Sequence, residues 1–204
     1  IMACDLLFYF AESINSSEIE RVQKTVVVPQ GNELLSVVQD RVLQKAYLES
    51  LSMNIAPYAT VVKPEDIEQG LRSIGYPAVM RPNQINSDSK NKAYFIYEES
   101  DIEKAKSLLR HGTCVLESWL VSDRAFSISA AKTATGEIRL YPIVEREYRE
   151  NRLSSTYVPQ NMDEELLNEM ERVAQVIFGE LDFSGVASVE FIVTPANALY
   201  VGVV

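Results

Sequence analysis

The chain has 204 residues, enough for one large domain or two small lobes with a hydrophobic core. Its composition, 47% hydrophobic and 24% charged, is ordinary for a soluble globular protein, and no apolar run approaches the roughly 20 residues of a membrane span. The formal net charge of −10 argues against a nucleic-acid-binding surface, because contacts to phosphates need clustered Lys and Arg.

Cysteine and histidine are scarce. Cys4 and Cys114 lie far apart, each in an apolar run, which predicts buried free thiols in a reducing compartment and hence a cytoplasmic protein. The single histidine, His111, offers little material for a histidine metal site or a catalytic triad. Its place just before Gly112 favours a structural role at the end of a helix.

The first third of the chain predicts short elements. Residues 1–10 read as a core strand and not as a signal peptide, because no basic segment precedes them. A short helix is expected over 16–23, a short buried strand over 25–29 and a longer helix over 32–53. The apolar run 198–204 closes the chain, and we expect a segment cut from a longer protein.

The middle of the chain predicts a compact split α/β unit, in the order strand, helix, strand, strand, helix, strand. Pro64 begins the first of these helices and Gly75 ends it. Ser100 and Glu103 predict a capping box for the second helix, which ends at Gly112. The expected strands cover residues 59–62, 78–81, 93–97 and 113–117.

The last third is expected to be rich in strands around one long helix. An apolar stripe over 163–178 predicts that helix, with Gly179 at its C-cap. Residues 150–162 are interpreted as an exposed loop. The expected strands cover residues 126–132, 137–145, 186–194 and 198–204.

Six short sequence strings lie, in order, over 39–45, 56–58, 74–79, 115–117, 136–145 and 185–191. In sequence and in spacing they resemble the ATP-grasp enzymes, most of all the ATPase subunit of phosphoribosylaminoimidazole carboxylase. The resemblance implies an α/β (α+β) ATP-grasp fold with two lobes of mixed or antiparallel sheets flanked by helices. Residues 1–54 would then end an N-terminal domain and its connecting helix, 55–120 would form the small lobe, and 121–204 would begin a truncated C-terminal lobe.

The resemblance also implies a function. Members of this family are ATP-dependent carbon–nitrogen ligases of purine biosynthesis, which activate bicarbonate with ATP and pass the carboxyl group to aminoimidazole ribonucleotide. ATP and Mg²⁺ are the implied cofactors, a nucleotide is the implied partner, and a homodimer is possible as in the family. Phosphoryl transfer mainly needs charge neutralisation and positioning, which agrees with basic residues around the phosphates and acidic residues around the metal.

Five residues match nucleotide contacts of the family. Arg41 matches a basic contact to ATP, although a solvated helix arginine is the structural alternative. Arg81 takes the place of the phosphate-binding lysine, and a guanidinium aims its donors differently from an ammonium. Glu117 and Leu120 match the hinge that meets the adenine. Trp119 lies between them in the sequence, and the alternative to a nucleotide contact is that it packs between the lobes.

The metal site and the phosphate loop depart from the family. Glu190 matches the first magnesium carboxylate, and a glutamate within an apolar strand is costly unless it faces a cleft or a cation. The second carboxylate should fall at 201–203, which reads Val-Gly-Val. Residues 84–91 replace a glycine-rich loop, Ala125 replaces an acidic contact to the ribose, and 145–148 lack the family's asparagine and histidine.

Three hypotheses follow. The first is a fragment or diverged paralogue of the carboxylase subunit, with weak or absent catalysis of its own. The second is a non-catalytic module that binds a nucleotide or a partner. The third is a structural remnant whose cleft is closed by side chains such as Phe126 and Tyr148.

Overall fold

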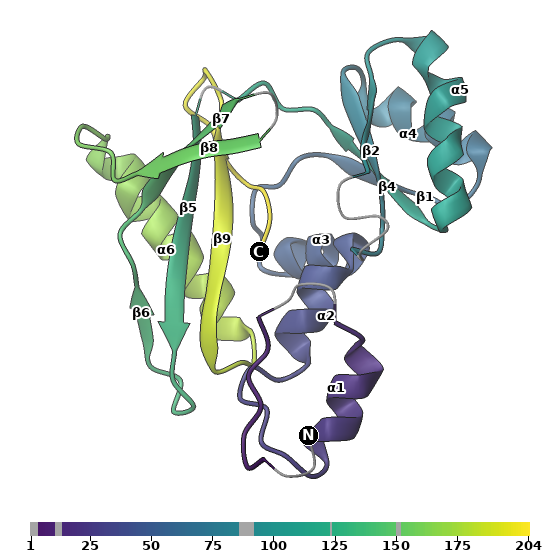
Figure 1. The fold of residues 1–204 in the computed structure, drawn as a ribbon. Coiled ribbons are helices and arrows are strands. Elements are labelled where there is room, and N and C mark those ends of the chain that lie inside the picture. Colours follow the sequence, from purple (N-terminus) through teal and green to yellow (C-terminus); the bar gives the residue numbers. More distant parts are fainter. Residues whose placement is uncertain (1–3, 11–13, 86–91, 123, 150–151) are drawn as a thin grey trace.

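The computed structural model describes residues 4–10, 14–85, 92–122, 124–149 and 152–204, and it consists of two antiparallel sheets with helices packed on them (Figure 1). The four-stranded sheet lies within the span predicted for the small lobe, and we call this part the small lobe. The six-stranded sheet, with its covering helix, is the large lobe. The predicted α/β class with antiparallel sheets is confirmed. None of the helices described here combines the length and apolar character needed to cross a membrane.

The small lobe has the strand order β1-β4-β2-β3. One face is covered by α4 (Pro64–Ile74) and by α5 (Ile102–Ala105), which continues from the turn η1 (Glu99–Asp101) into η2 (Lys106–His111). The predicted order of strands and helices is confirmed. The strands are β1 (Tyr58–Val61), β2 (Ala78–Pro82), β3 (Tyr94–Ile96) and β4 (Cys114–Ser118).

Gly70 lets α4 lie close to the small sheet. A Cβ atom added there would lie 2.9 Å from Cδ2 of Leu116 and 3.1 Å from Cβ of Ala59. Such contacts would force the helix away from the sheet, because protein interiors are already close-packed. The close packing of α4 on the small sheet thus depends on the absence of a side chain at residue 70.

The large lobe has the strand order β10-β9-β5-β7-β8, with β6 paired to β5. Its helix α6 (Glu164–Glu180) begins at Asp163, whose carboxylate accepts from the amide of Glu165. Alternate residues of β5 and β9, including Phe126 and Phe191, are buried against α6. The strands are β5 (Arg124–Lys132), β6 (Ile138–Leu140), β7 (Val144–Arg149), β8 (Arg152–Tyr157), β9 (Gly185–Val193) and β10 (Leu199–Val201).

The single helix predicted over 32–53 is wrong, because the backbone becomes extended at Asp40. This residue separates α2 (Glu33–Gln39) from α3 (Arg41–Ser50) and caps the second helix, its carboxylate accepting from the amide of Leu43 at 2.8 Å. The preceding helix, α1 (Ser16–Gln23), lies where it was predicted.

Asp40 also joins α3 to the end of β2. Its carboxylate accepts from Asn83 at 2.9 Å and from Gln84 at 2.5 Å. In return, the amide of Arg41 donates to the carbonyl of Asn83 at 3.1 Å, and the amide of Val42 donates to its side-chain oxygen at 2.8 Å. We call these residues, 40–42 with 83–84, the Asp40 junction.

Several local expectations need correction in the large lobe. Residues 150–162 are not all loop, since β8 pairs with β7 over part of this span. The strand expected over 137–145 is divided into β6 and the start of β7. Helix α6 also continues through Gly179, so that Leu181 is its C-cap.

The N-terminal segments expected as strands over 1–10 and 25–29 form, among their described residues, one bridge between Leu6 and Val27, whose side chains are exposed. Val26 and Val28 are buried, as expected for the second segment. Cys4 is exposed, contrary to expectation, whereas Cys114 is buried and burial raises the pKa of its thiol to about 11. In the small lobe the capping box is formed by Glu98 with Asp101, and not by Ser100 with Glu103.

Candidate functional site

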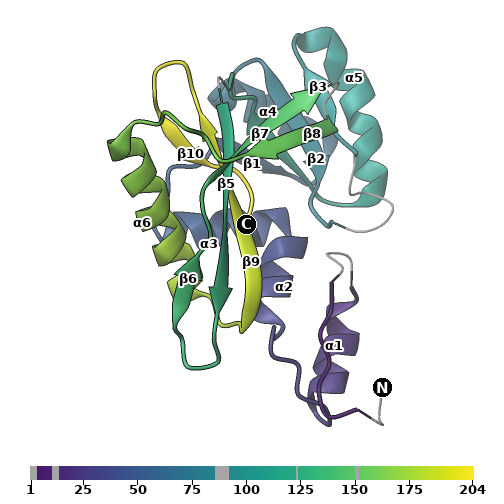
Figure 2. The ribbon, with the colours of Figure 1, turned by 60° about the vertical axis from the view of Figure 1, so that its left-hand side comes forward.

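The two lobes meet on one side of the large sheet. In both views the large sheet lies between α6 and the small lobe (Figures 1 and 2). The face of the sheet turned away from α6 is therefore the face that looks toward the small lobe. The chain crosses directly between the lobes after Ser118, the end of β4, and re-enters a strand at Arg124.

A cluster of charges lies at the base of the small lobe. Glu117 of β4 forms an ion pair with Lys45 of α3 through one carboxylate oxygen, and with Arg81 of β2 through the other at 2.6 Å. The side chains of Lys45 and Glu117 are only 7% and 14% exposed. Arg41 completes this group, which we call the Glu117 cluster, and its Nε donates to the carbonyl of Pro82 at 3.2 Å.

The electrostatics of the Glu117 cluster are unbalanced. Burial by itself raises the pKa of Glu117, but the charges of Lys45 and Arg81 outweigh burial and hold that pKa below its usual range. Burial and the charge of Arg81 lower the pKa of Arg41. Three cations thus surround one carboxylate, and such an excess of positive charge in a half-buried site favours an anionic ligand.

The structure brings together three of the residues predicted to bind nucleotide, Arg41, Arg81 and Glu117. Arg41 is half-buried and bonded to the backbone of β2, so it is not a solvated helix arginine. Lys45 was not singled out, although it follows Arg41 by four residues and therefore lies on the same face of α3. Its ammonium also lies 5.1 Å from the ring centroid of Tyr58.

The crossing between lobes begins at the two remaining predicted nucleotide contacts. The backbone amide of Trp119 donates to the carbonyl of Pro77 at 2.9 Å, which fixes the start of the crossing to the small lobe. The indole packs edge-to-face on Phe95 with ring centroids 4.8 Å apart, and 39% of Trp119 stays exposed. Leu120 is half-buried beside it. The exposed part of the Trp119 indole can contact a planar ligand at this crossing.

The first charge pair of the large sheet is formed by Arg124 and Glu145. The guanidinium contacts both carboxylate oxygens, at 2.7 Å and 2.6 Å, and thus makes a bidentate pair. These hydrogen bonds are the main reason that the pKa of Glu145 lies below its usual value. Glu145 is the cross-strand partner of Phe126, so this pair lies on the α6 side of the sheet.

The second pair joins Arg146 of β7 to Glu190 of β9, across the intervening strand β5. Arg146 lies opposite Ala125, and Glu190 lies opposite Ser127. Because side chains alternate along a strand, both point to the face turned toward the small lobe. Arg146 also lies over the ring of Tyr148, 5.4 Å from its centroid.

The residues around Glu190 do not fit a magnesium ion. Its carboxylate, expected to face a cation, is already paired with the guanidinium of Arg146. At the expected place of a second carboxylate, the amide of Gly202 donates to the carbonyl of Glu190 at 2.8 Å. Magnesium prefers oxygen ligands and needs a net negative site, whereas this carboxylate is neutralised within the protein.

A cavity of about 500 Å³ surrounds this end of the large sheet. It combines guanidinium groups of both charge pairs with carboxylates and two phenol rings. The first lining residue, Ser122, follows the predicted adenine hinge at 117–120 by two positions in the sequence. The lining residues are Ser122, Arg124, Ala125, Glu145, Arg146, Glu147, Tyr148, Arg149 and Tyr157.

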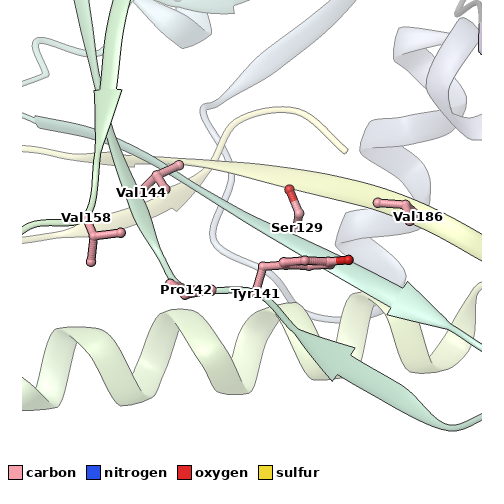
Figure 3. A pocket seen from close by; sticks show the side chains of 6 residues that line it. All are labelled: Ser129, Tyr141, Pro142, Val144, Val158 and Val186. Atoms are coloured by element: carbon pink, nitrogen blue, oxygen red, sulfur yellow. The ribbon is translucent and has the colours of Figure 1, made fainter.

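A second hollow of about 360 Å³ lies farther along the same sheet (Figure 3). Its lining residues are Ser129, Tyr141, Pro142, Val144, Val158 and Val186. The hydroxyl of Ser129 is within 2.7 Å of the hydroxyl of Ser188. Because no charged side chain lines this hollow, it is poorly suited to a phosphate group.

Two residues proposed to close the cleft occupy different places. Phe126 is fully buried in the core beneath the sheet, so it does not fill the space between the lobes. Tyr148 lines the larger cavity and stays exposed. Most of the altered loop at 84–91 lies outside the described residues, which end at Ile85 and resume at Lys92.

Comparison with known proteins gives consistent matches. The ATP-grasp domain family matches residues 46–202. N5-carboxyaminoimidazole ribonucleotide synthase of Bacillus subtilis (strain 168) is 29% identical over 197 residues, which are 97% of this chain and 52% of that protein. The protein of the same name from Staphylococcus aureus (strain MRSA252) is 27% identical over 198 residues, with the same coverage of 97% and 52%. The chain therefore spans about half the length of the curated relatives it matches.

Solved structures agree with these relatives. An ADP complex of N5-carboxyaminoimidazole ribonucleotide synthetase superimposes with a TM-score of 0.90 at 27% identity, over 98% of this chain and 52% of that chain. The ADP complex of N5-carboxyaminoimidazole synthetase from Staphylococcus aureus gives a TM-score of 0.89 at 26% identity, with coverage of 98% and 52%.

Proposed function

This chain belongs to the ATP-grasp family, and on that premise we propose that it binds an adenine nucleotide between its two lobes. The observation that carries the proposal is the Glu117 cluster, in which three cations surround a single buried carboxylate. The solved relatives that hold ADP support the choice of nucleotide. The phosphates would neutralise the excess charge that the cluster leaves uncompensated.

Each part of the site has a proposed role. Arg41 and Arg81 bind phosphate oxygens, because their guanidinium groups carry donors suited to them. The backbone of residues 117–120 meets the adenine edge, and Trp119 borders the ring. Lys45 holds the carboxylate of Glu117 in place and so positions Arg81.

The proposed reaction is the ATP-dependent carboxylation of aminoimidazole ribonucleotide in purine biosynthesis, by analogy with the relatives named above. In it, a phosphoryl group of ATP would pass to bicarbonate, and the activated carboxyl group would pass to the amine of the ribonucleotide. Positioning and charge neutralisation are the protein's main contributions to such a transfer. We propose that turnover by this chain is weak or absent.

A non-catalytic nucleotide-binding module is the second candidate function. It is favoured by the Arg146–Glu190 pair, which neutralises the carboxylate expected to hold magnesium. Such a module would bind the nucleotide through the Glu117 cluster without transferring its phosphoryl group.

Unfolding in the presence of nucleotide tests the proposal. ADP at about 100 times its dissociation constant should add roughly 2.7 kcal/mol to the free energy of unfolding, seen as a raised midpoint of Trp119 fluorescence. Tripolyphosphate serves as the control for charge alone, and it should shift the midpoint less than ADP does. An unchanged midpoint with both ADP and ATP would refute the proposed function.

Turnover separates the two candidates. A carboxylase with impaired catalysis predicts slow ATP consumption, above the rate without protein, that depends on both bicarbonate and aminoimidazole ribonucleotide. The binding module predicts saturable binding with no consumption above the rate without protein.

The proposal extends to the compartment and the oligomeric state of the protein. We propose a cytoplasmic protein, in keeping with the buried thiol of Cys114. We also propose a homodimer, as the family resemblance implies, which sedimentation velocity would distinguish from a monomer.

A further inference from the structure

Arg146 and Glu190 lie opposite Ala125 and Ser127 of β5, on the sheet face turned away from α6. That face looks toward the small lobe (Figures 1 and 2). Arg146 is 15% exposed and Glu190 is 38% exposed, so the pair is accessible from the space between the lobes but not fully solvated.

In the small lobe, Arg81 and Glu117 alternate along their strands with the core residues Met80 and Leu116, so they lie on the sheet face turned away from α4 and α5. A ligand between the lobes would therefore meet a guanidinium on the large sheet as well as on the small lobe.

The pair also lies where a family member would present a carboxylate to a metal ion. For Glu190 to bind Mg²⁺, its carboxylate would either release Arg146 or share its single negative charge between Arg146, paired through Oε1, and the metal. In both cases the guanidinium would face a divalent cation at close range, which adds a repulsion between the two cations. Binding of the metal by Glu190 is therefore unfavourable at a half-buried site, where charges interact more strongly than in water.

We propose that Arg146 supplies, from within the protein, the positive charge that the family takes from Mg²⁺, so that this chain binds its nucleotide as the metal-free anion. This inference rests on the proposed nucleotide site. It concerns the ionic form of the ligand and the residue that neutralises it.

A guanidinium can pair with Glu190 and bind a phosphate oxygen at the same time. It carries five N–H donors in a plane, and the contact with one oxygen of Glu190 leaves donors on its other edges for a phosphate oxygen. The ring of Tyr148 lies beneath the guanidinium and limits its movement. Glu190 thereby becomes a positioning residue for Arg146, and it has no direct contact with the ligand.

The test compares binding of AMP-PNP, a non-hydrolysable ATP analogue, in excess EDTA and in millimolar Mg²⁺, by isothermal titration calorimetry on the wild-type chain. The proposal predicts dissociation constants that agree within about threefold. A Kd at least about tenfold lower in Mg²⁺ overturns the inference but leaves the proposed function standing. If neither condition gives saturable binding, both the inference and the proposed function fail.

A variant pair locates the effect. Arg146→Gln should weaken AMP-PNP binding in EDTA by about tenfold or more, because a charge-assisted contact is lost. It should also make binding respond to Mg²⁺, since Glu190 is released. Arg172→Gln is the matched control, because it removes a guanidinium from an exposed pair on α6 and should leave both titrations unchanged. Equal affinities of Arg146→Gln and wild type in EDTA would overturn the inference.

Discussion

The two lobes treat buried charge differently. In the small lobe, Glu117 is surrounded by Arg41, Lys45 and Arg81, so that the cluster carries more positive than negative charge. On the large sheet, Glu145 pairs with Arg124 and Glu190 pairs with Arg146, so each of these two carboxylates has its own guanidinium.

The difference indicates which lobe requires a ligand. A buried excess of like charges is costly until a counterion arrives, so the small lobe gains stability from an anion. The two pairs on the large sheet are already balanced, and they have less to gain from an added cation. The proposed binding of a nucleotide without a metal would satisfy both lobes.

Glu117→Gln should give the largest effect, because it leaves buried Lys45 and Arg81 without their counter-charge. We expect a loss of about 3 kcal/mol in the free energy of unfolding, measured by urea denaturation. Glu169→Gln removes a carboxylate from an exposed pair on α6 and should cost less than about 1 kcal/mol. Similar losses for the two variants would mean that the Glu117 cluster is as solvated as the surface.

Arg124→Gln should cost about 2 kcal/mol, because Glu145 is left half-buried without its bidentate partner. Arg172→Gln breaks a pair of the same bidentate geometry on the surface of α6, where Arg172 is 60% exposed. Thermal unfolding of both variants isolates the contribution of burial. If the two midpoints fall equally, the large-sheet pair contributes no more than a surface pair.

Arg81→Ala should act on the ligand more than on the fold, because Lys45 still pairs with Glu117. We expect the Kd for ADP to rise about tenfold, with Arg81→Lys in between, as fluorescence titration would show. Arg139→Ala, which removes an exposed side chain of β6, should leave the Kd unchanged. An unaltered Kd in Arg81→Ala would remove this arginine from the nucleotide site.

The pH dependence of stability should give the smallest effect near neutrality. Since the folded protein holds the pKa of Glu117 below its usual value, the stability due to this carboxylate is complete above pH of about 4.3, the ordinary pKa of glutamate. It is lost as the pH falls through the lowered value, where the folded state also takes up the proton. Wild type and Glu117→Gln should therefore differ by a constant free energy from pH 7 to about 5 and converge below about 4. Convergence that begins near pH 6 would contradict the lowered pKa.

Much of the fold could be predicted where local chemistry marks an element. Pro64 and Gly75 delimit α4 in the sequence as they do in the structure, and Asp163 caps α6. The break at Asp40 could not be predicted, because the apolar spacing continues through it and the competing hydrogen bonds come from Asn83, 43 residues away. Strand β8 was missed because an edge strand rich in serine and threonine lacks alternating apolar residues.

The sequence named several residues of the candidate site, but it did not predict which of them pair with one another. Arg41, Arg81 and Glu117 follow from the resemblance, and the structure brings them together. The pairing of Arg146 with Glu190 depends on the register of two non-neighbouring strands against β5, which no local pattern encodes. Glu190 was expected to face a cleft or a cation and to bind magnesium, and in the structure its carboxylate pairs with the guanidinium of Arg146.

The Asp40 junction has a mechanical consequence. Its hydrogen bonds join the residues after β2 to the first turn of α3, so the small lobe contacts α3 at a point remote in sequence from the crossing at Trp119. The chain that leads from α3 into β1 and the ion pair of Lys45 with Glu117 join the same two parts at further points. We therefore expect α3 and the small lobe to move together as one body when the angle between the lobes changes.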